Sequence, residues 1–128
     1  LLVKPYKGVS TKVAFETLDF SCAEHPDCRR MREALIGNDY DGVLQSLGNT
    51  LEQSAFKLVP QIATIKQELL ALGFDGALMS GSGSTVFALT RDPELLEKGA
   101  AAMRKKAAFI RKTELRPQEE FPYKRYDR

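Results

Sequence analysis

The chain has 128 residues, a formal net charge of +2, 43% hydrophobic and 28% charged residues. This length suits one domain with a buried core, and the composition is typical of a globular protein. The small net charge argues against a nucleic-acid or membrane-surface partner, and no apolar run approaches the roughly 18 residues of a membrane span. Two cysteines, Cys22 and Cys28, are too few for a secreted disulfide framework and favour a reduced, cytoplasmic setting.

The first part of the chain predicts a short strand and a helix. Residues 1–3 form the strand, and Pro5 ends it. Ser10 or Thr11 caps the helix, which runs to Leu18. Because the sequence opens on an apolar strand rather than on Met, and has no signal-peptide pattern, we expect a piece of a longer protein.

Three helical patterns follow in the middle of the chain. Residues 22–27 predict a loop, with Pro26 in the first turn of a helix that ends at Gly37. A pattern beginning at Asp39 is interrupted at residues 48–49, so it predicts two short helices or one bent helix. The third helix begins at Pro60, carries an apolar stripe at helical spacing, and ends at Gly73.

The pattern then changes to strands. Residues 76–79 and 85–89 are short apolar runs joined by a glycine-rich loop. Asp92 and Pro93 begin a helix that runs to about Lys106. A last strand is expected at residues 108–110, with a possible extension over 112–115.

This order of elements predicts an α+β fold of the ferredoxin-like type. Two βαβ units around a central hairpin give a split βαβ antiparallel sheet with helices on one face, enlarged here by extra helices. We expect one domain over residues 1–115 and a polar C-terminal tail over residues 116–128.

The glycine-rich loop, Ser80 to Thr85, has the sequence S-G-S-G-S-T. It lacks the third glycine and the following helix of a dinucleotide-binding motif, and it lacks the lysine of a P-loop. Two interpretations remain from the residues alone. One is a plain hairpin turn that needs positive φ angles, and the other is a site whose backbone N–H groups and hydroxyls face an anion.

Other candidate sites are weaker. Cys22, His25 and Cys28 supply only three possible metal ligands, so we predict no metal site. The basic residues near the C-terminus are diluted by acidic ones, which favours a solvated helix end over a nucleic-acid surface. No nucleophile–base pair or carboxylate dyad can be assembled, so we predict no catalytic residue in this chain.

Four motifs resemble the C-terminal domain of the 4-diphosphocytidyl-2-C-methyl-D-erythritol kinase family, within the GHMP kinase superfamily. Residues 3–15 are similar to its V-x-P-x-x-x-V-S-T-x-x-x-F entry, and residues 48–52 are similar to its N-x-L-E helix start. Residues 60–66 fit as well, and residues 79–87 resemble the M-S-G-S-G-P-T-V-F glycine motif, with Ser84 in place of proline. The resemblance covers roughly residues 2–112 and leaves the tail unexplained.

The resemblance implies a kinase that transfers the γ-phosphoryl group of ATP, with Mg²⁺, to the 2-hydroxyl of a cytidyl-methylerythritol substrate in non-mevalonate isoprenoid synthesis. It places the ATP loop and the catalytic residues in a missing N-terminal domain of the same chain. It also assigns a phosphate-side loop and a possible substrate-side loop to this chain. The former comprises Gly81, Ser82, Gly83, Ser84 and Thr85, and the latter Gly8, Val9, Ser10 and Thr11.

Three functional interpretations therefore stay open. The favoured one is a folded but inactive C-terminal kinase domain, whose small-molecule substrate binds with the help of the absent domain. A second is a free-standing ferredoxin-like module that binds a ligand at its hairpin and regulates without catalysis. The third is the same domain of another GHMP kinase, of the homoserine or mevalonate type.

Overall fold

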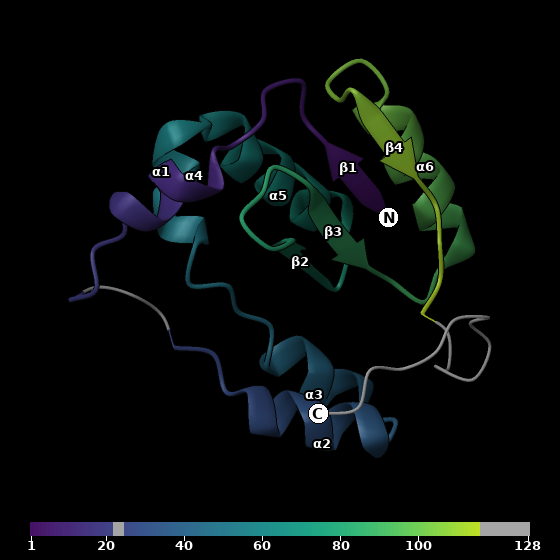
Figure 1. Ribbon diagram of the computed structural model, residues 1–128. Helices are drawn as coiled ribbons and strands as arrows, with labels where there is room; N and C mark the ends of the chain where they lie inside the picture. Colours follow the sequence, from purple (N-terminus) through teal and green to yellow (C-terminus); the bar gives the residue numbers. More distant parts are fainter. Residues whose placement is uncertain (22–24, 116–128) are drawn as a thin grey trace, which may run out of the picture.

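A computed structural model describes residues 1–21 and 25–115 of the chain (Figure 1). Its centre is a four-stranded antiparallel sheet with the spatial order β2–β3–β1–β4. This order confirms the predicted split βαβ topology, because the first and third strands are the central pair. The strands are β1 (Leu2–Lys4), β2 (Gly76–Met79), β3 (Val86–Leu89) and β4 (Phe109–Arg111).

Six helices connect the strands within the described ranges, five of them between β1 and β2. The interrupted pattern after Asp39 forms two short helices, which was one of its two interpretations. The helices are α1 (Thr11–Glu16), α2 (Cys28–Ile36), α3 (Tyr40–Gln45), α4 (Glu52–Leu58), α5 (Pro60–Leu72) and α6 (Pro93–Met103). No helix in this part of the chain is long and apolar enough to cross a membrane.

The helix ends follow local hydrogen bonding. The Ser10 hydroxyl accepts from the Val13 N–H, and the Asp92 carboxylate accepts from the Glu94 N–H at the start of α6. Gly73 ends α5 with a φ of 114°, a conformation that glycine adopts without strain. These three positions agree with the predicted helix boundaries.

Several boundaries differ from the prediction. Pro26 precedes the cap of α2, where the Asp27 carboxylate accepts from the Arg30 N–H at 3.0 Å, so it is not in the first turn. Helix α1 ends at Glu16 and α6 at Met103, two and about three residues early. Residues 112–115 are not a strand, and the predicted tail lies outside the described residues.

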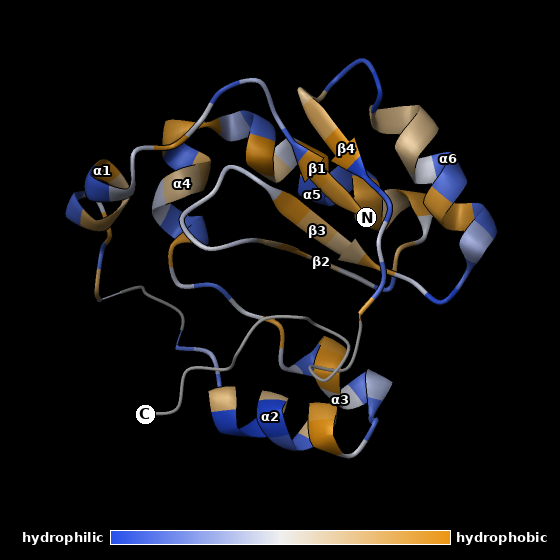
Figure 2. Cartoon of the chain, turned by 45° about the vertical axis from the view of Figure 1, so that its right-hand side comes forward, coloured by the Kyte–Doolittle hydropathy of each residue, from blue (hydrophilic) through white to orange (hydrophobic). Residues whose placement is uncertain are grey.

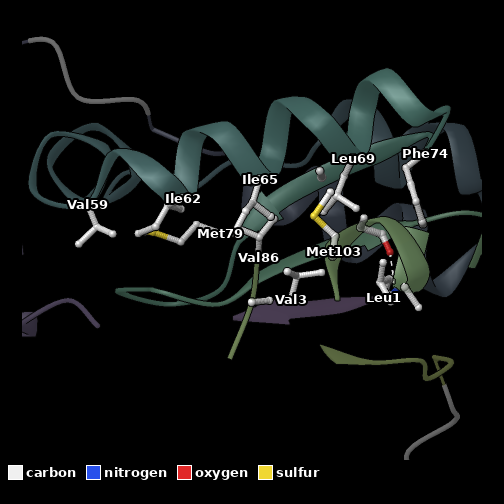
Figure 3. Packing of buried hydrophobic residues seen from close by; sticks show 14 of the residues in the cluster. Leu1, Val3, Val59, Ile62, Ile65, Leu69, Phe74, Met79, Val86 and Met103 are labelled. Carbon is white, nitrogen blue, oxygen red and sulfur yellow. Dashed lines mark hydrogen bonds between the residues drawn. The ribbon is translucent and has the colours of Figure 1, made fainter. Parts of the chain in front are cut away.

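The core lies between α5, α6 and one face of the sheet. Ile62, Ile65 and Leu69 project from one side of α5 toward Met79 and Val86 on the strands below (Figure 3). Each of these side chains is buried, and complete burial of such a side chain contributes about 1.5–3 kcal/mol. The predicted apolar stripe is therefore the contact that fixes α5, and with it the ends of β2 and β3.

The opposite face of the sheet carries α2 and α3, which stand apart from the other helices in Figures 1 and 2. Leu44 and Leu47 approach β2 so closely that a Cβ at Gly76 would lie 2.9 and 2.8 Å from them. This differs from the prediction of helices on one face. The physical reason is that Leu2 and Phe87 make this face of the sheet apolar as well, so it also needs cover.

Candidate functional site

The glycine-rich loop connects β2 and β3 at the end of the sheet near α1 and α4 (Figure 1). Inside the loop, the Ser80 N–H donates to the Thr85 carbonyl at 2.8 Å, and the Gly83 N–H donates to the Ser80 carbonyl at 3.0 Å. Gly81 and Gly83 have φ angles of 57° and 96°, which side-chain-bearing residues rarely adopt. The loop is thus a tight turn that both glycines make possible.

Asn49, just before α4, holds the loop from one side. Its Nδ2 donates to the carbonyl of Met79 at 2.7 Å and to the carbonyl of Gly81 at 2.8 Å. Its Oδ1 accepts from the Leu51 N–H at 3.0 Å, at the start of α4. One amide side chain therefore ties the backbone of the loop to the beginning of a helix 30 residues earlier in the sequence.

Glu52, in the first turn of α4, holds the last residue of β2. Its carboxylate accepts from the Met79 N–H at 3.0 Å and pairs with the Lys66 ammonium of α5 at 2.8 and 3.0 Å. The Glu52 side chain is only 11% exposed and that of Lys66 is 24% exposed. The buried carboxylate is therefore both neutralised and hydrogen-bonded, as a buried charge requires.

The structure brings the two loops of the sequence prediction together. The Thr11 hydroxyl lies 2.9 Å from the Ser82 hydroxyl, and one of them donates to the other. Val9 packs beside the loop as well, because a Cβ at Gly83 would lie 3.3 Å from its Cγ2. Residues 8–11 and the glycine-rich loop therefore line one continuous surface at this end of the molecule, although Ser84 is buried beneath it.

Several polar groups of the glycine-rich loop have no partner within residues 1–21 and 25–115. The backbone N–H groups of Gly81, Ser82 and Ser84 donate to no acceptor there. The Ser84 hydroxyl is also without a hydrogen bond, although the residue is only 2% exposed. Gly81 is exposed and Ser82 is half-buried, so water or a ligand can satisfy their N–H groups, whereas the unpaired groups of Ser84 are buried. Free backbone N–H groups close together in a tight turn have the chemistry of an anion-facing surface.

Asn49, Glu52 and Lys66 are functional candidates that the sequence prediction did not assign to a site. The signal for the first two was present, since both belong to the N-x-L-E motif of residues 49–52. Nothing in that motif indicates that its polar residues turn toward a loop about 30 positions later. Lys66 closes the similar motif of residues 60–66, but a lysine on an amphipathic helix is ordinarily a solvated residue, so the motif did not point to a buried ion pair.

A cleft lies between the opposite face of the sheet and α2–α3, away from the glycine-rich loop. It is an apolar cleft of about 630 Å³ whose lining includes Leu2, Phe87 and Leu47. Tyr40 at its edge donates to the Asp75 carboxylate at 2.6 Å, and the Arg91 guanidinium stacks 4.2 Å from the Tyr40 ring. Partial burial, reinforced by Asp75, raises the pKa of Tyr40 to about 12. None of the predicted site residues lines this cleft.

Two of the three possible metal ligands, His25 and Cys28, belong to the described residues, and Cys22 lies outside them. Cys28 is an exposed, unpaired thiol at the start of α2. Among the described residues, no group of three His, Cys, Asp or Glu side chains is arranged to hold a metal ion.

Comparison with known families gives a match over residues 31–108 to the model of the GHMP kinases C terminal. The chain belongs to the GHMP kinase C-terminal domain family. The matched residues begin within α2, continue past the end of α6 and include the whole glycine-rich loop. The match confirms the superfamily resemblance seen in the motifs.

Curated relatives of this GHMP domain are named 4-diphosphocytidyl-2-C-methyl-D-erythritol kinase. One from Listeria monocytogenes serotype 4a (strain HCC23) is 44% identical over 91 residues, 71% of this chain and 31% of the relative. One from Bacillus pumilus (strain SAFR-032) is 45% identical over 89 residues, 70% of this chain and 31% of the relative. The chain thus spans about a third of the length of these relatives.

Solved structures agree with this assignment to the GHMP fold. A crystal structure of 4-(cytidine 5'-diphospho)-2C-methyl-D-erythritol kinase matches with a TM-score of 0.66 and 28% identity, over 83% of this chain and 38% of that one. A homoserine kinase from Cytophaga hutchinsonii ATCC 33406 matches with a TM-score of 0.62 and 25% identity, over 81% and 35% of the two chains. The α+β fold class is therefore shared by two kinases with different acceptors in their names.

Proposed function

We propose that this chain is the C-terminal domain of a kinase that transfers the γ-phosphoryl group of ATP to the 2-hydroxyl of 4-diphosphocytidyl-2-C-methyl-D-erythritol. This reaction is a step in non-mevalonate isoprenoid precursor synthesis. The proposal rests on the backbone N–H groups of Gly81, Ser82 and Ser84 in the glycine-rich loop, which have no acceptor among the described residues. The relatives that bear this kinase name, at 44–45% identity, supply the acceptor.

The proposed role of the loop is to bind and orient phosphate oxygens. Phosphoryl transfer depends mainly on positioning and on stabilising charge at the equatorial oxygens. Backbone N–H groups at Gly81, Ser82 and Ser84, with the Ser82 and Thr85 hydroxyls, are donors whose positions are already set before the reaction. Gly83 contributes by letting the chain turn at a φ of 96°. These five residues form the phosphate side of the proposed site.

The proposed substrate side comprises Gly8, Val9, Ser10 and Thr11. Support comes from the contact of Thr11 with Ser82, which fixes this segment next to the glycine-rich loop. A Cβ at Gly8 would meet nothing within 4 Å, so a ligand can approach the backbone there. The Ser10 hydroxyl is engaged at the cap of α1, which leaves Thr11 as the hydroxyl closest to the phosphate side.

ATP and Mg²⁺ are the proposed cofactors of the full-length enzyme. Mg²⁺ prefers carboxylate and phosphate oxygens. The Glu52 carboxylate beside the loop is committed to Lys66 and to the Met79 N–H, so the residues of this loop do not fit a metal site. The proposed ligands of Mg²⁺ are therefore phosphate oxygens and groups of the N-terminal domain.

The proposed partner is an N-terminal GHMP domain of the same polypeptide, working in the cytoplasm. The exposed, unpaired thiol of Cys28 is compatible with a reducing compartment. Support for the missing domain comes from the coverage, since this chain matches only 31% of each curated relative. Because no described residue forms a nucleophile–base pair, we expect the isolated 128-residue chain to be inactive.

The test is phosphate transfer by the full-length protein. We expect ADP and a phosphorylated product with ATP, Mg²⁺ and 4-diphosphocytidyl-2-C-methyl-D-erythritol, and no turnover with homoserine. Homoserine is the comparison acceptor because the homoserine kinase fold matches almost as well. The variant Ser82→Ala should lower kcat about 10-fold, less than the roughly two to three orders of magnitude that loss of a donor to a developing charge costs, because the backbone N–H of residue 82 remains. Lys106→Met, which removes an exposed ion pair with Glu68, is the control.

Two results would contradict the proposal. Turnover of homoserine but not of the cytidyl substrate would assign the domain to another GHMP kinase. Turnover by the purified 128-residue chain alone would show that the catalytic groups lie within it.

A further inference from the structure

We propose that Asn49, Glu52 and Lys66 form a buried positioning brace that sets the backbone of the glycine-rich loop for phosphate binding. The inference rests on the proposed function, in that phosphate is taken to be the ligand of the loop. None of the three side chains needs to touch a substrate. Each acts through the backbone of residues 79–81.

Asn49 controls where two carbonyl groups of the loop point. Its single NH₂ group donates to Met79 and to Gly81, whose carbonyls lie on either side of Ser80. A peptide unit whose carbonyl is held inward presents the following N–H in a fixed direction, because the peptide group is planar. Holding the Gly81 carbonyl therefore orients the N–H of Ser82, one of the spare donors.

Glu52 and Lys66 fix the point from which the loop starts. The Met79 N–H is the last donor of β2, and it is bonded to a carboxylate rather than to a neighbouring strand. Lys66 neutralises that carboxylate from α5, whose apolar side is packed on the same strand. A buried ion pair contributes little net stability, but it can hold the backbone at the end of β2 in one geometry.

The first experiment uses Asn49→Asp in the 128-residue chain. Aspartate is nearly isosteric and its oxygen still accepts from the Leu51 N–H, so the start of α4 is retained. It has no donor for the two carbonyls and repels them. We expect amide hydrogen exchange at Ser80 and Gly83 to accelerate at least about 10-fold, with no change at Ala88, because only the local opening equilibrium is altered.

Ser54→Ala is the matched control for this experiment. Ser54 is buried in α4, and its hydroxyl donates to the Leu51 carbonyl and, among the described residues, not to the loop. Exchange at Ser80 and Gly83 should be unchanged in this control. Unchanged exchange at both amides in Asn49→Asp would overturn the brace, as would a uniform acceleration that includes Ala88.

The second experiment separates positioning from stability in the full-length protein. Lys66→Met leaves the Glu52 carboxylate unpaired, whereas the double variant Glu52→Gln, Lys66→Met keeps an acceptor for the Met79 N–H without a buried charge. We expect the single variant to lose about 10-fold in kcat with less than about a 3-fold change in KM for ATP. The double variant should recover most of that loss.

The outcomes distinguish this inference from the proposed function. Faster exchange at the loop in Asn49→Asp, together with an unchanged kcat of the full-length variant, would show that Asn49 holds the loop but that this does not affect phosphate transfer. That result would overturn the inference. Failure of the full-length protein to phosphorylate the cytidyl substrate while it still transfers phosphate to another acceptor would revise the substrate only. Equal losses in the single and double variants would show that Lys66 acts on something other than the loop.

Discussion

The two segments of the candidate site are held in different ways. The glycine-rich loop is tied from below by Asn49 and Glu52, and its two glycines adopt φ angles of 57° and 96°. Residues 8–11 are mostly exposed, and they contact the loop through the hydroxyl pair of Thr11 and Ser82 and through the Val9 side chain beside Gly83. The conformation of the glycine-rich loop is therefore fixed by buried side chains, whereas the position of residues 8–11 depends on their contact with that loop. Substitutions that add one methyl group should reveal this difference.

Gly83→Ala should give the largest effect. A Cβ at Gly83 would lie 3.1 Å from Met79 Sδ and 3.3 Å from Val9 Cγ2, and the φ of 96° is unfavourable for alanine. We expect a loss of about 2–3 kcal/mol in the free energy of unfolding, from backbone strain and overpacking together. Urea unfolding of the 128-residue chain measures it. A loss below about 0.5 kcal/mol would show that the loop is not held rigidly.

Gly81→Ala tests strain without crowding. The φ of 57° lies in the left-handed region, but a Cβ there would meet nothing within 4 Å. The expected loss is about 1 kcal/mol, the usual cost of that conformation for a residue with a side chain. If Gly81→Ala proved as costly as Gly83→Ala, contact with Met79 and Val9 would add nothing to the cost at Gly83.

Ser84→Ala should be neutral or stabilise the isolated chain by up to about 1 kcal/mol. The buried hydroxyl of Ser84 has no hydrogen bond among the described residues, and removing an unsatisfied polar group relieves its desolvation cost. Thermal unfolding of both proteins gives the comparison. A clear destabilisation would mean that this hydroxyl has a structural partner, such as a bound water, and would weaken its assignment to the phosphate side.

Gly8→Ala, in the substrate-side segment of residues 8–11, should have the smallest effect of the four substitutions. The position is exposed, and a Cβ there would meet nothing within 4 Å. The free energy of unfolding is expected to change by less than about 0.5 kcal/mol, as for an ordinary surface substitution. A loss equal to that of Gly83→Ala would show that residues 8–11 are as tightly preset as the glycine-rich loop.

The sequence predicts local features of this fold well. Asp92 with Pro93, and Gly73, mark helix ends through bonds to their nearest neighbours, and the stripe on α5 follows from its period. The order of strands follows from the order of elements, because split βαβ units have few compatible topologies.

Long-range contacts are where sequence reasoning falls short. The sequence predicted helices on one face of the sheet only. Strands β1 and β3 are too short for their hydrophobic pattern to show that both faces are apolar. The brace was missed because Asn49 and Glu52 have the pattern of a helix start, and their partners at residues 79–81 are 27–32 residues away. The glycine-rich loop was found by composition, but its role as a phosphate side stays a prediction.

The most direct test of the central claim is amide chemical-shift mapping of the full-length protein with a non-hydrolysable ATP analogue. We expect the largest shifts within this domain at the N–H groups of Gly81, Ser82 and Ser84, three donors that have no acceptor among the described residues. Shifts confined to residues outside 80–85, with these three amides unmoved at saturation, would contradict it.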